Sequence, residues 1–451
     1  MCSSNCRDEW DALVISPQRR QEIIDALRRG TVPRMGLDAF AVNLTRFEST
    51  LDEELSRVKT GAGMFKAVRG EYGSGKTFFG RWLQERAKRS GFAASEVQIS
   101  ETETPLHRLE TVYRRLAERL STGDTREGAL RSIIDGWFYA LEQDVLAEGR
   151  IPESESEALL TRTNELMEQR LAVITRTAPA LAAALRGYRQ ALAVGNSATA
   201  EALIAWLGAQ PNVSGEAKRF AGVRGEIDHF GALSFLQGLL VMLRDSGHAG
   251  LLLVLDEVET LQRVRSDVRD KGLNALRQLI DEVDAGRFPG LYLLVTGTPS
   301  FFDGPQGVQR LAPLAQRLQV DFSTDARFEN PRAVQIRLPG FNRDALCEVG
   351  RKVRDIFAEH TANAERIKRI ADDTFVADLA AAVTGKLGGR VGIAPRIFLK
   401  KLVADILDRI DQFPDFNPLQ HYALTIVDSE LSEAEREAAA AKSVDDIELS
   451  V

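Results

Sequence analysis

Eight consecutive residues could bind phosphate: Gly70-Glu71-Tyr72-Gly73-Ser74-Gly75-Lys76-Thr77 match the pattern G-x-x-x-x-G-K-[ST]. They follow FKAV, which predicts a strand, and precede FFGRWLQERAKRS, which predicts a helix. The glycines let backbone N–H groups wrap around an anionic phosphate, and the N-terminus of the helix adds its positive end. Lys76 would reach the β and γ phosphates, and Thr77 would offer a hydroxyl to Mg²⁺. The spacing therefore predicts a nucleotide-binding site that runs from residue 70 to Phe78.

A second stretch, LLLVLDEVE, places two acids after a run of aliphatic residues that predicts a buried strand. Asp256 would hold Mg²⁺ through its water shell, and Glu257 is placed to orient and polarise an attacking water. Two acids here are also typical of the start of the next helix, where they would act only as caps. Because the phosphate-binding loop lies upstream, we favour the catalytic interpretation, with Glu257 indicating hydrolysis and not passive holding of the nucleotide.

Both motifs require a sheet to position them, and five short aliphatic or β-branched runs predict one. The runs are residues 64–68, 96–100, 251–256, 291–296 and 334–338. Helical patterns fill the gaps: residues 232–244, for example, repeat leucine at helical spacing before Gly247. Strands that alternate with helices predict an α/β fold of the P-loop type, a parallel five-stranded sheet flanked by helices.

Long stretches without strand signals divide the chain further. About 150 residues between the second and third strands read as amphipathic helices, and residues 341–412 are helical again. We predict an N-terminal helical segment, an ATPase core in two parts, a helical insertion, a helical lid domain, and an acidic tail that is disordered. These are residues 1–35; 36–124 and 226–340; 125–225; 341–427; and 428–451. The insertion is either a structural cap or a surface for partners.

Composition excludes several classes of protein. The 451 residues are 44% hydrophobic and 27% charged, which is typical of a globular protein with a substantial core. No apolar run is long enough to span a bilayer, and we expect no membrane association. Three cysteines are too few for a disulfide framework, and the N-terminus lacks a secretory pattern, so we expect a cytoplasmic protein.

The net charge of −7 is concentrated at one end. Residues 428–451 hold eight acids and two basic residues, so the remaining chain is nearly neutral. Residues 384–401 carry five basic residues and no acid, a pattern that fits either a path for DNA phosphates or an ordinary solvated face. Charge thus neither requires nor excludes binding to double-stranded DNA.

These motifs resemble those of the AAA+ class of P-loop ATPases, specifically its origin-recognition-like members. The resemblance implies ATP and Mg²⁺ as cofactors, a strand order of 5-1-4-3-2, and a polar residue after the fourth strand that senses the γ-phosphate. Thr298, which precedes Pro299, fits that position best and Thr296 is the reserve, although this class usually has Asn there.

The same resemblance implies two roles for arginines. Gly392-Ile393-Ala394-Pro395-Arg396 looks like the start of a lid helix, which would place Arg396 beside the nucleotide. An arginine of one subunit would complete the site of the next in a homo-oligomer, and the helix predicted within GVQRLAPLAQRLQVDF offers Arg317 first and Arg310 second. Either arginine could instead lie on a solvated face.

Seven stretches in order resemble the BrxC/BrxD family of BREX phage-defence ATP-binding proteins: RRQEIIDALRRGTVP, GLDAFAVNL, VRGEYGSGKTFF, LVLDEVETL, VTGTPSFF, LAQRL and GIAPR. The resemblance implies that residues 30–37 pack near the adenine. It also implies an ATPase that oligomerises and regulates or loads a DNA-processing partner, helicase-like or a methyltransferase. The alternative is a nucleotide-gated signalling scaffold that recruits protein partners without binding DNA.

Overall fold

The computed structural model describes residues 15–149, 154–176, 178–323, 325–359, 361–387, 395–431 and 436. The chain divides into two compact units, which are described separately. Unit 1 comprises Met1–Glu48, Gly70–Glu85 and Arg337–Val451, and unit 2 comprises Ser49–Arg69 and Arg86–Ile336.

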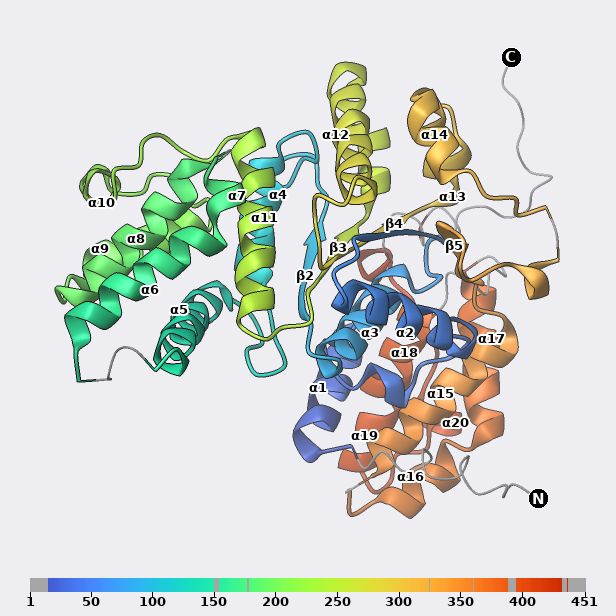
Figure 1. Ribbon diagram of the computed structural model, residues 1–451. Helices are drawn as coiled ribbons and strands as arrows, with labels where there is room; N and C mark the ends of the chain where they lie inside the picture. The colour runs from blue at the N-terminus through green and yellow to red at the C-terminus, as the bar shows by residue number, and fades with distance from the viewer. Residues whose placement is uncertain are drawn as a thin grey trace, which may run out of the picture. The chain divides into compact units, whose positions relative to one another are not determined.

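A five-stranded sheet lies at the centre of unit 2 (Figure 1). Its strands are β1 (Met64–Arg69), β2 (Ala93–Gln98), β3 (Leu251–Asp256), β4 (Leu291–Gly297) and β5 (Gln335–Arg337). The order across the sheet is β2-β3-β4-β1-β5, and the pairs β2–β3, β3–β4 and β1–β4 are parallel. This is the order that the AAA+ resemblance implies, and the α/β class with a parallel sheet is confirmed.

All five predicted strands form, and four of them lie within one residue of their predicted bounds. Every residue of β3 and β4 is buried, as expected for parallel strands that are covered on both faces. The second strand starts three residues earlier than predicted and ends at Gln98, so the prediction of residues 96–100 is displaced toward the C-terminus. Ala93 and Ala94 are fully buried, but alanine gives little strand signal, so the pattern becomes visible only near Val97.

The helices between β2 and β3 are α4 (Leu109–Arg119), α5 (Leu130–Ala147), α6 (Ser156–Arg170), α7 (Ala172–Thr175), α8 (Pro179–Ala193), α9 (Ser197–Leu207), α10 (Gly215–Phe220) and α11 (His229–Asp245). The α4 helix packs on β2, and α11 packs on α4 and α5. Figure 1 shows the green helices α6, α8 and α9 beyond α11, farther from the strands. Their buried side chains, such as Leu185 and Trp206, belong to the same hydrophobic cluster as β2 and β3.

The remaining elements of unit 2 follow β3 and β4, and α2 (Thr45–Lys59) enters the unit before β1. They are η2 (Val258–Gln262), α12 (Ser266–Asp284), α13 (Pro299–Asp303), η3 (Val308–Arg310), α14 (Ala312–Leu318) and η4 (Ala326–Phe328). The single helix predicted over GVQRLAPLAQRLQVDF is wrong: it forms η3 and α14 with Leu311 extended between them. Pro313 lies in the first turn of α14, where its missing N–H costs no hydrogen bond, so it starts a new helix.

Unit 1 is mainly helical. Its elements are α1 (Pro17–Arg28), η1 (Leu37–Ala39), α15 (Arg343–Ala358), α16 (Ala364–Ile370), α17 (Asp373–Lys386), α18 (Pro395–Lys400), the π-helical η6 (Lys401–Leu407), α19 (Asp408–Gln412), α20 (Pro418–His421) and η7 (Asp428–Glu430). The helix α3 (Lys76–Arg89) begins in this unit. Arg28 of α1 makes a bidentate contact of 2.6 and 2.8 Å with the Asp408 carboxylate, which fixes α1 to the lid helices.

None of the helices in the described ranges is both long and apolar enough to cross a membrane. Of the predicted acidic tail, residues 428–431 are described, and the rest except Arg436 lies outside the described residues.

Candidate functional site

The backbone of the loop at residues 70–77 has the form that phosphate binding requires. Gly73 and Gly75 have φ of 80° and 88°, a region that side chains with a Cβ rarely adopt. A Cβ on Gly70 would lie 2.3 Å from Ser74 Oγ, so this position also requires glycine. The α3 helix starts at Lys76, directly after the loop, and its N-terminus supplies unsatisfied N–H groups.

Two polar side chains of the loop, Lys76 and Ser74, are buried, and the Ser74 hydroxyl has no hydrogen-bond partner among the described residues. Lys76 Nζ donates to the Gly70 carbonyl at 2.8 Å and lies 5.1 Å from the Tyr72 ring centroid. Because buried hydroxyls are normally paired, this orphaned oxygen and the ammonium fit an anionic ligand such as a triphosphate.

Residues 30–40 are tied to the helix that carries the loop. Glu85 of α3 accepts hydrogen bonds from the N–H groups of Gly36 and Leu37 at 3.0 and 2.9 Å. Arg81 donates to the Val32 carbonyl at 2.6 Å, and the Phe40 ring packs edge-on against Phe78 at 5.2 Å. The segment that the resemblance places near the adenine therefore has a fixed position relative to α3, while its contact with a base stays a prediction.

The acidic pair lies at the carboxyl end of β3 in unit 2. Asp256 is the last, buried residue of the strand, and Thr296 of β4 donates its hydroxyl to Asp256 Oδ1. Thr296 is fully buried. A carboxylate that is fixed by a neighbouring strand can accept a metal or its water without first being ordered.

Glu257 leaves the strand through an unusual backbone conformation. Its φ and ψ are 59° and 43°, in the left-handed region that non-glycine residues seldom adopt. Its N–H donates to Thr296 Oγ1 at 3.4 Å, and Gln98 Nε2 donates to Glu257 Oε2 at 2.8 Å. Gln98 ends β2 directly beside Asp256, because the two residues are partners in the β2–β3 register. Strands β2, β3 and β4 thus hold one carboxylate pair together.

Gln98 is absent from the sequence-based site. The strand predicted over residues 96–100 would place Gln98 in its middle, where a side chain points to a face of the sheet and not past its edge. In the structure β2 ends at Gln98, so its amide lies at the carboxyl edge. Because alanine gives little strand signal, the sequence offers no clear sign that β2 starts at Ala93 and ends at Gln98.

The two threonines of the fourth strand have different surroundings. Thr298, the preferred sensor in the sequence, is the residue before α13, and its hydroxyl lies 3.0 Å from Ser300 Oγ. Thr296, the reserve, contacts both Asp256 and Glu257. The structure thus brings Thr296 to the acidic pair, and the sensing role of Thr298 stays a prediction.

Both candidate trans-acting arginines are paired with acids of α12. Arg317 Nε lies 2.7 Å from Asp281 Oδ1, and its Nη1 lies 3.2 Å from Asp284 Oδ2. Arg310 pairs with Asp270, and its hydrogen bond lowers the pKa of that carboxyl. Both guanidinium groups lie at the surface, where such pairs are weak and exchangeable.

Pro395 starts the lid helix α18 as the sequence predicts, and Arg396 follows it in the first turn. The Arg396 guanidinium donates to the backbone carbonyl of Glu430. Gly392, Ile393 and Ala394 of the lid motif, and Arg390 of the basic stretch, lie outside the described residues.

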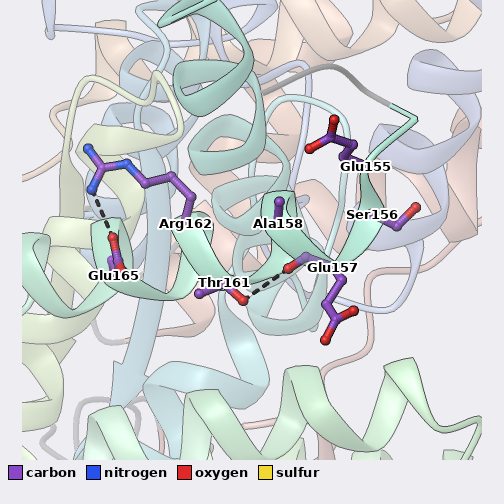
Figure 2. A pocket seen from close by; sticks show the side chains of 7 residues that line it. All are labelled: Glu155, Ser156, Glu157, Ala158, Thr161, Arg162 and Glu165. Carbon is purple, nitrogen blue, oxygen red and sulfur yellow. Dashed lines mark hydrogen bonds and ion pairs between the residues drawn. The ribbon is translucent and has the colours of Figure 1, made fainter. Parts of the chain in front are cut away.

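A pocket on α6 has polar residues that already pair with one another. The pocket in Figure 2 is lined by one stretch of α6 and by Glu155, the residue before it. Its polar groups pair locally: Arg162 with Glu165 at 3.0 Å, and the Thr161 hydroxyl with the Glu157 carbonyl at 3.0 Å. Within the described ranges, no three His, Cys, Asp or Glu side chains cluster as a preformed metal site. The roles of Thr77 and Asp256 toward Mg²⁺ therefore stay predictions from the sequence.

The chain matches the model of a known protein family. The family model described as "BREX system ATP-binding protein BrxC/D" matches residues 15–426. The matched range includes residues 70–77, the acidic pair Asp256 and Glu257, and α18. No curated protein matches the chain.

Proposed function

This chain belongs to the family of BREX system ATP-binding proteins BrxC/D, and from that premise we propose that it hydrolyses the ATP it binds and so regulates or loads a DNA-processing partner. The observation that carries hydrolysis is Glu257, held in a left-handed backbone by contacts from β2 and β4. Strained residues of this kind persist only where surrounding structure enforces them, and they cluster at functional sites.

The phosphate-binding loop supplies the binding energy in this proposal. Lys76 exchanges its contact with the Gly70 carbonyl for the β and γ phosphates, because its ammonium is attracted more strongly by charged phosphate oxygens than by a neutral carbonyl oxygen. Backbone N–H groups of residues 70–77 and the start of α3 surround the remaining phosphate charge. Thr77 and Asp256 would hold Mg²⁺, which would neutralise charge on the β and γ phosphates.

Glu257 acts as the base that orients the attacking water. A carboxylate that must align a water needs a fixed position, and Gln98 and Thr296 provide it. Gln98 touches the Glu257 carboxylate and would not itself touch the substrate, so its role is positioning.

The surface arginines are compatible with assembly of the chain into a homo-oligomer. A homo-oligomer that completes its site in trans requires Arg317 to leave Asp281 and Asp284, and a neighbouring triphosphate would compete well for it because the pairs are exposed. The partner would be a helicase-like enzyme or a methyltransferase acting on DNA, as the BREX family resemblance implies.

The direct experiment compares Lys76→Ala and Glu257→Gln for binding and turnover of a fluorescent ATP analogue. Lys76→Ala should weaken binding by about 10- to 100-fold, the loss expected for a charged hydrogen-bond donor. Glu257→Gln should bind as wild type does and lower the hydrolysis rate by about 100-fold or more. Arg89→Ala, which removes a positive charge at the other end of α3, is the control and should leave both unchanged. Wild-type turnover by Glu257→Gln would refute the assignment.

A further inference from the structure

Three basic side chains of the lid converge on one acidic turn near the C-terminus. Arg396 donates to the Glu430 carbonyl oxygen. Lys400 Nζ donates to Glu430 Oε1 at 2.9 Å, and Lys401 Nζ donates to Oε2 at 2.9 Å. Both the backbone and the side chain of Glu430 are therefore held by the lid, in the segment where the sequence predicts the start of a disordered tail.

The surroundings make this a built contact and not a chance surface pair. Lys401 is only 6% exposed and also pairs with Asp405 at 3.3 Å. Asp405 therefore holds the Lys401 ammonium in place independently of Glu430. Leu431, next in the chain, is buried. The π-helical segment η6 starts at Lys401, and short π-helical segments within helices are frequent at functional sites.

The turn that contains Glu430 binds Arg396, the arginine that we propose contacts the nucleotide. A guanidinium is attracted more strongly by the charged oxygens of a phosphate, which it can bind through two parallel hydrogen bonds, than by one neutral carbonyl oxygen such as that of Glu430. Nucleotide phosphate would therefore compete effectively for Arg396, while the hydrogen bonds from Lys400 and Lys401 to the Glu430 carboxylate oppose release of the turn.

We propose that η7 with Leu431 is an intramolecular latch that occupies Arg396 until nucleotide phosphate displaces it. This proposal rests on the proposed function, because it assigns Arg396 to the nucleotide. If only molecules with a released latch bind nucleotide, the apparent Kd equals the intrinsic Kd divided by the fraction of released molecules. The latch therefore lowers the apparent nucleotide affinity. Release of the turn would report nucleotide binding at the C-terminal end of the chain.

The latch should be insensitive to pH near neutrality. Burial acts to raise the pKa of the Glu430 carboxyl, but hydrogen bonds from Lys400 and Lys401 outweigh it and lower the pKa to about 2. Because the folded pKa lies below the ordinary value of 4.5, the contribution of Glu430 is complete above pH 4.5 and is lost as the pH falls toward about 2. Added salt should weaken the latch instead, since its ion pairs are only partly buried.

The test titrates the full chain and its Glu430→Gln variant with a fluorescent ATP analogue. Glu430→Gln removes the charge that the lysines hold, and we expect apparent affinity to rise about three- to tenfold, equivalent to the net contribution of about one hydrogen bond. Asp415→Asn, which removes an exposed carboxylate from the same unit, is the matched control and should leave affinity unchanged. In the Arg396→Ala background, Glu430→Gln should give no gain.

Two outcomes overturn the latch while leaving the nucleotide site intact. One is wild-type affinity for Glu430→Gln with a lower unfolding temperature, which would mean that the contact only supports the lid. The other concerns the unmodified chain: amide exchange in residues 427–431 should accelerate when a non-hydrolysable ATP analogue binds, and unchanged exchange contradicts the proposal. Lys76→Ala in the same titration separates the two claims, because undiminished binding by that variant would refute the nucleotide site itself.

Discussion

Glu257, the proposed base, also has a strained backbone conformation. A non-glycine residue in the left-handed region costs about 1–3 kcal/mol, and here Thr296 and Gln98 hold the residue in that conformation. The sequence predicts Asp256 and Glu257 because strand and acids are contiguous. It does not predict Gln98, which is about 160 residues away in the chain and comes beside Asp256 only through the β2–β3 register.

Replacing Gln98 with leucine should lower the hydrolysis rate and spare binding. The variant keeps similar volume but loses the hydrogen bond that orients the Glu257 carboxylate, so we expect kcat to fall about tenfold with Kd unchanged. Steady-state turnover and a binding titration measure the two constants. Gln98→Asn, which retains the amide, should recover part of the rate. A change in Kd of the same size would instead indicate a structural role.

Thr296 and Thr298 can be separated by matched substitutions to valine. Thr296→Val removes the hydroxyl that contacts Asp256 and Glu257, and we expect a loss in hydrolysis rate of about tenfold or more, together with a higher Mg²⁺ requirement. Thr298→Val removes a hydroxyl that contacts Ser300 and should have a smaller effect. Hydrolysis measured as a function of Mg²⁺ concentration decides between them, and a larger effect at Thr298 would restore the sensor that the sequence favours.

Among the elements, β1 is joined to its neighbours by a buried ion pair. Lys66 of β1 is 1% exposed and lies 2.7 Å from Glu54 of α2, while Tyr292 of β4 donates to the same carboxylate at 2.5 Å. Lys66 also donates to the Pro331 carbonyl at 2.8 Å, just before β5. Burial lowers the pKa of Lys66, although Glu54 acts in the opposite direction. The sequence predicts the strand here but gives no sign that its lysine points inward.

Breaking this pair should destabilise unit 2 strongly. Lys66→Met leaves the Glu54 carboxylate buried without its cation, and we expect a loss of about 3–5 kcal/mol in the free energy of unfolding. Replacing Glu54 with leucine in the same chain should recover much of that loss, because no uncompensated charge then remains. Denaturant unfolding measures both. The exposed pair Arg332–Glu53 is the control, and Arg332→Ala should change stability little. Equal effects at the two pairs would contradict the importance of burial.

At the scale of the whole chain, we ask whether the helices between β2 and β3 fold independently of the sheet. Their amphipathic pattern predicts the helices but not what their apolar faces cover, so the sequence suggests an insertion at residues 125–225. In the structure those faces share one hydrophobic cluster with β2 and β3. Local periodicity defines elements, whereas packing between distant elements depends on the tertiary fold.

Removing a buried side chain of α8 should therefore also destabilise the sheet. Leu185 is fully buried, and Leu185→Ala should cost about 2–5 kcal/mol through lost contacts and the cavity left behind. If the cluster is cooperative, amide exchange should accelerate in β3 as well as in α8. Leu192→Ala, on the same helix but 47% exposed, should change neither. Faster exchange confined to the helices would show that they fold independently.

The most direct test of the whole account is the specific rate of ATP hydrolysis as a function of protein concentration, with and without duplex DNA, and with Glu257→Gln as the blank. We predict a rate that exceeds the blank, rises with concentration as Arg317 is transferred from its α12 acids to a neighbouring subunit, and rises further with DNA. A rate above the blank that is flat in both variables would favour the nucleotide-gated scaffold. A wild-type rate equal to that of Glu257→Gln would contradict the central claim that Asp256 and Glu257 serve ATP hydrolysis.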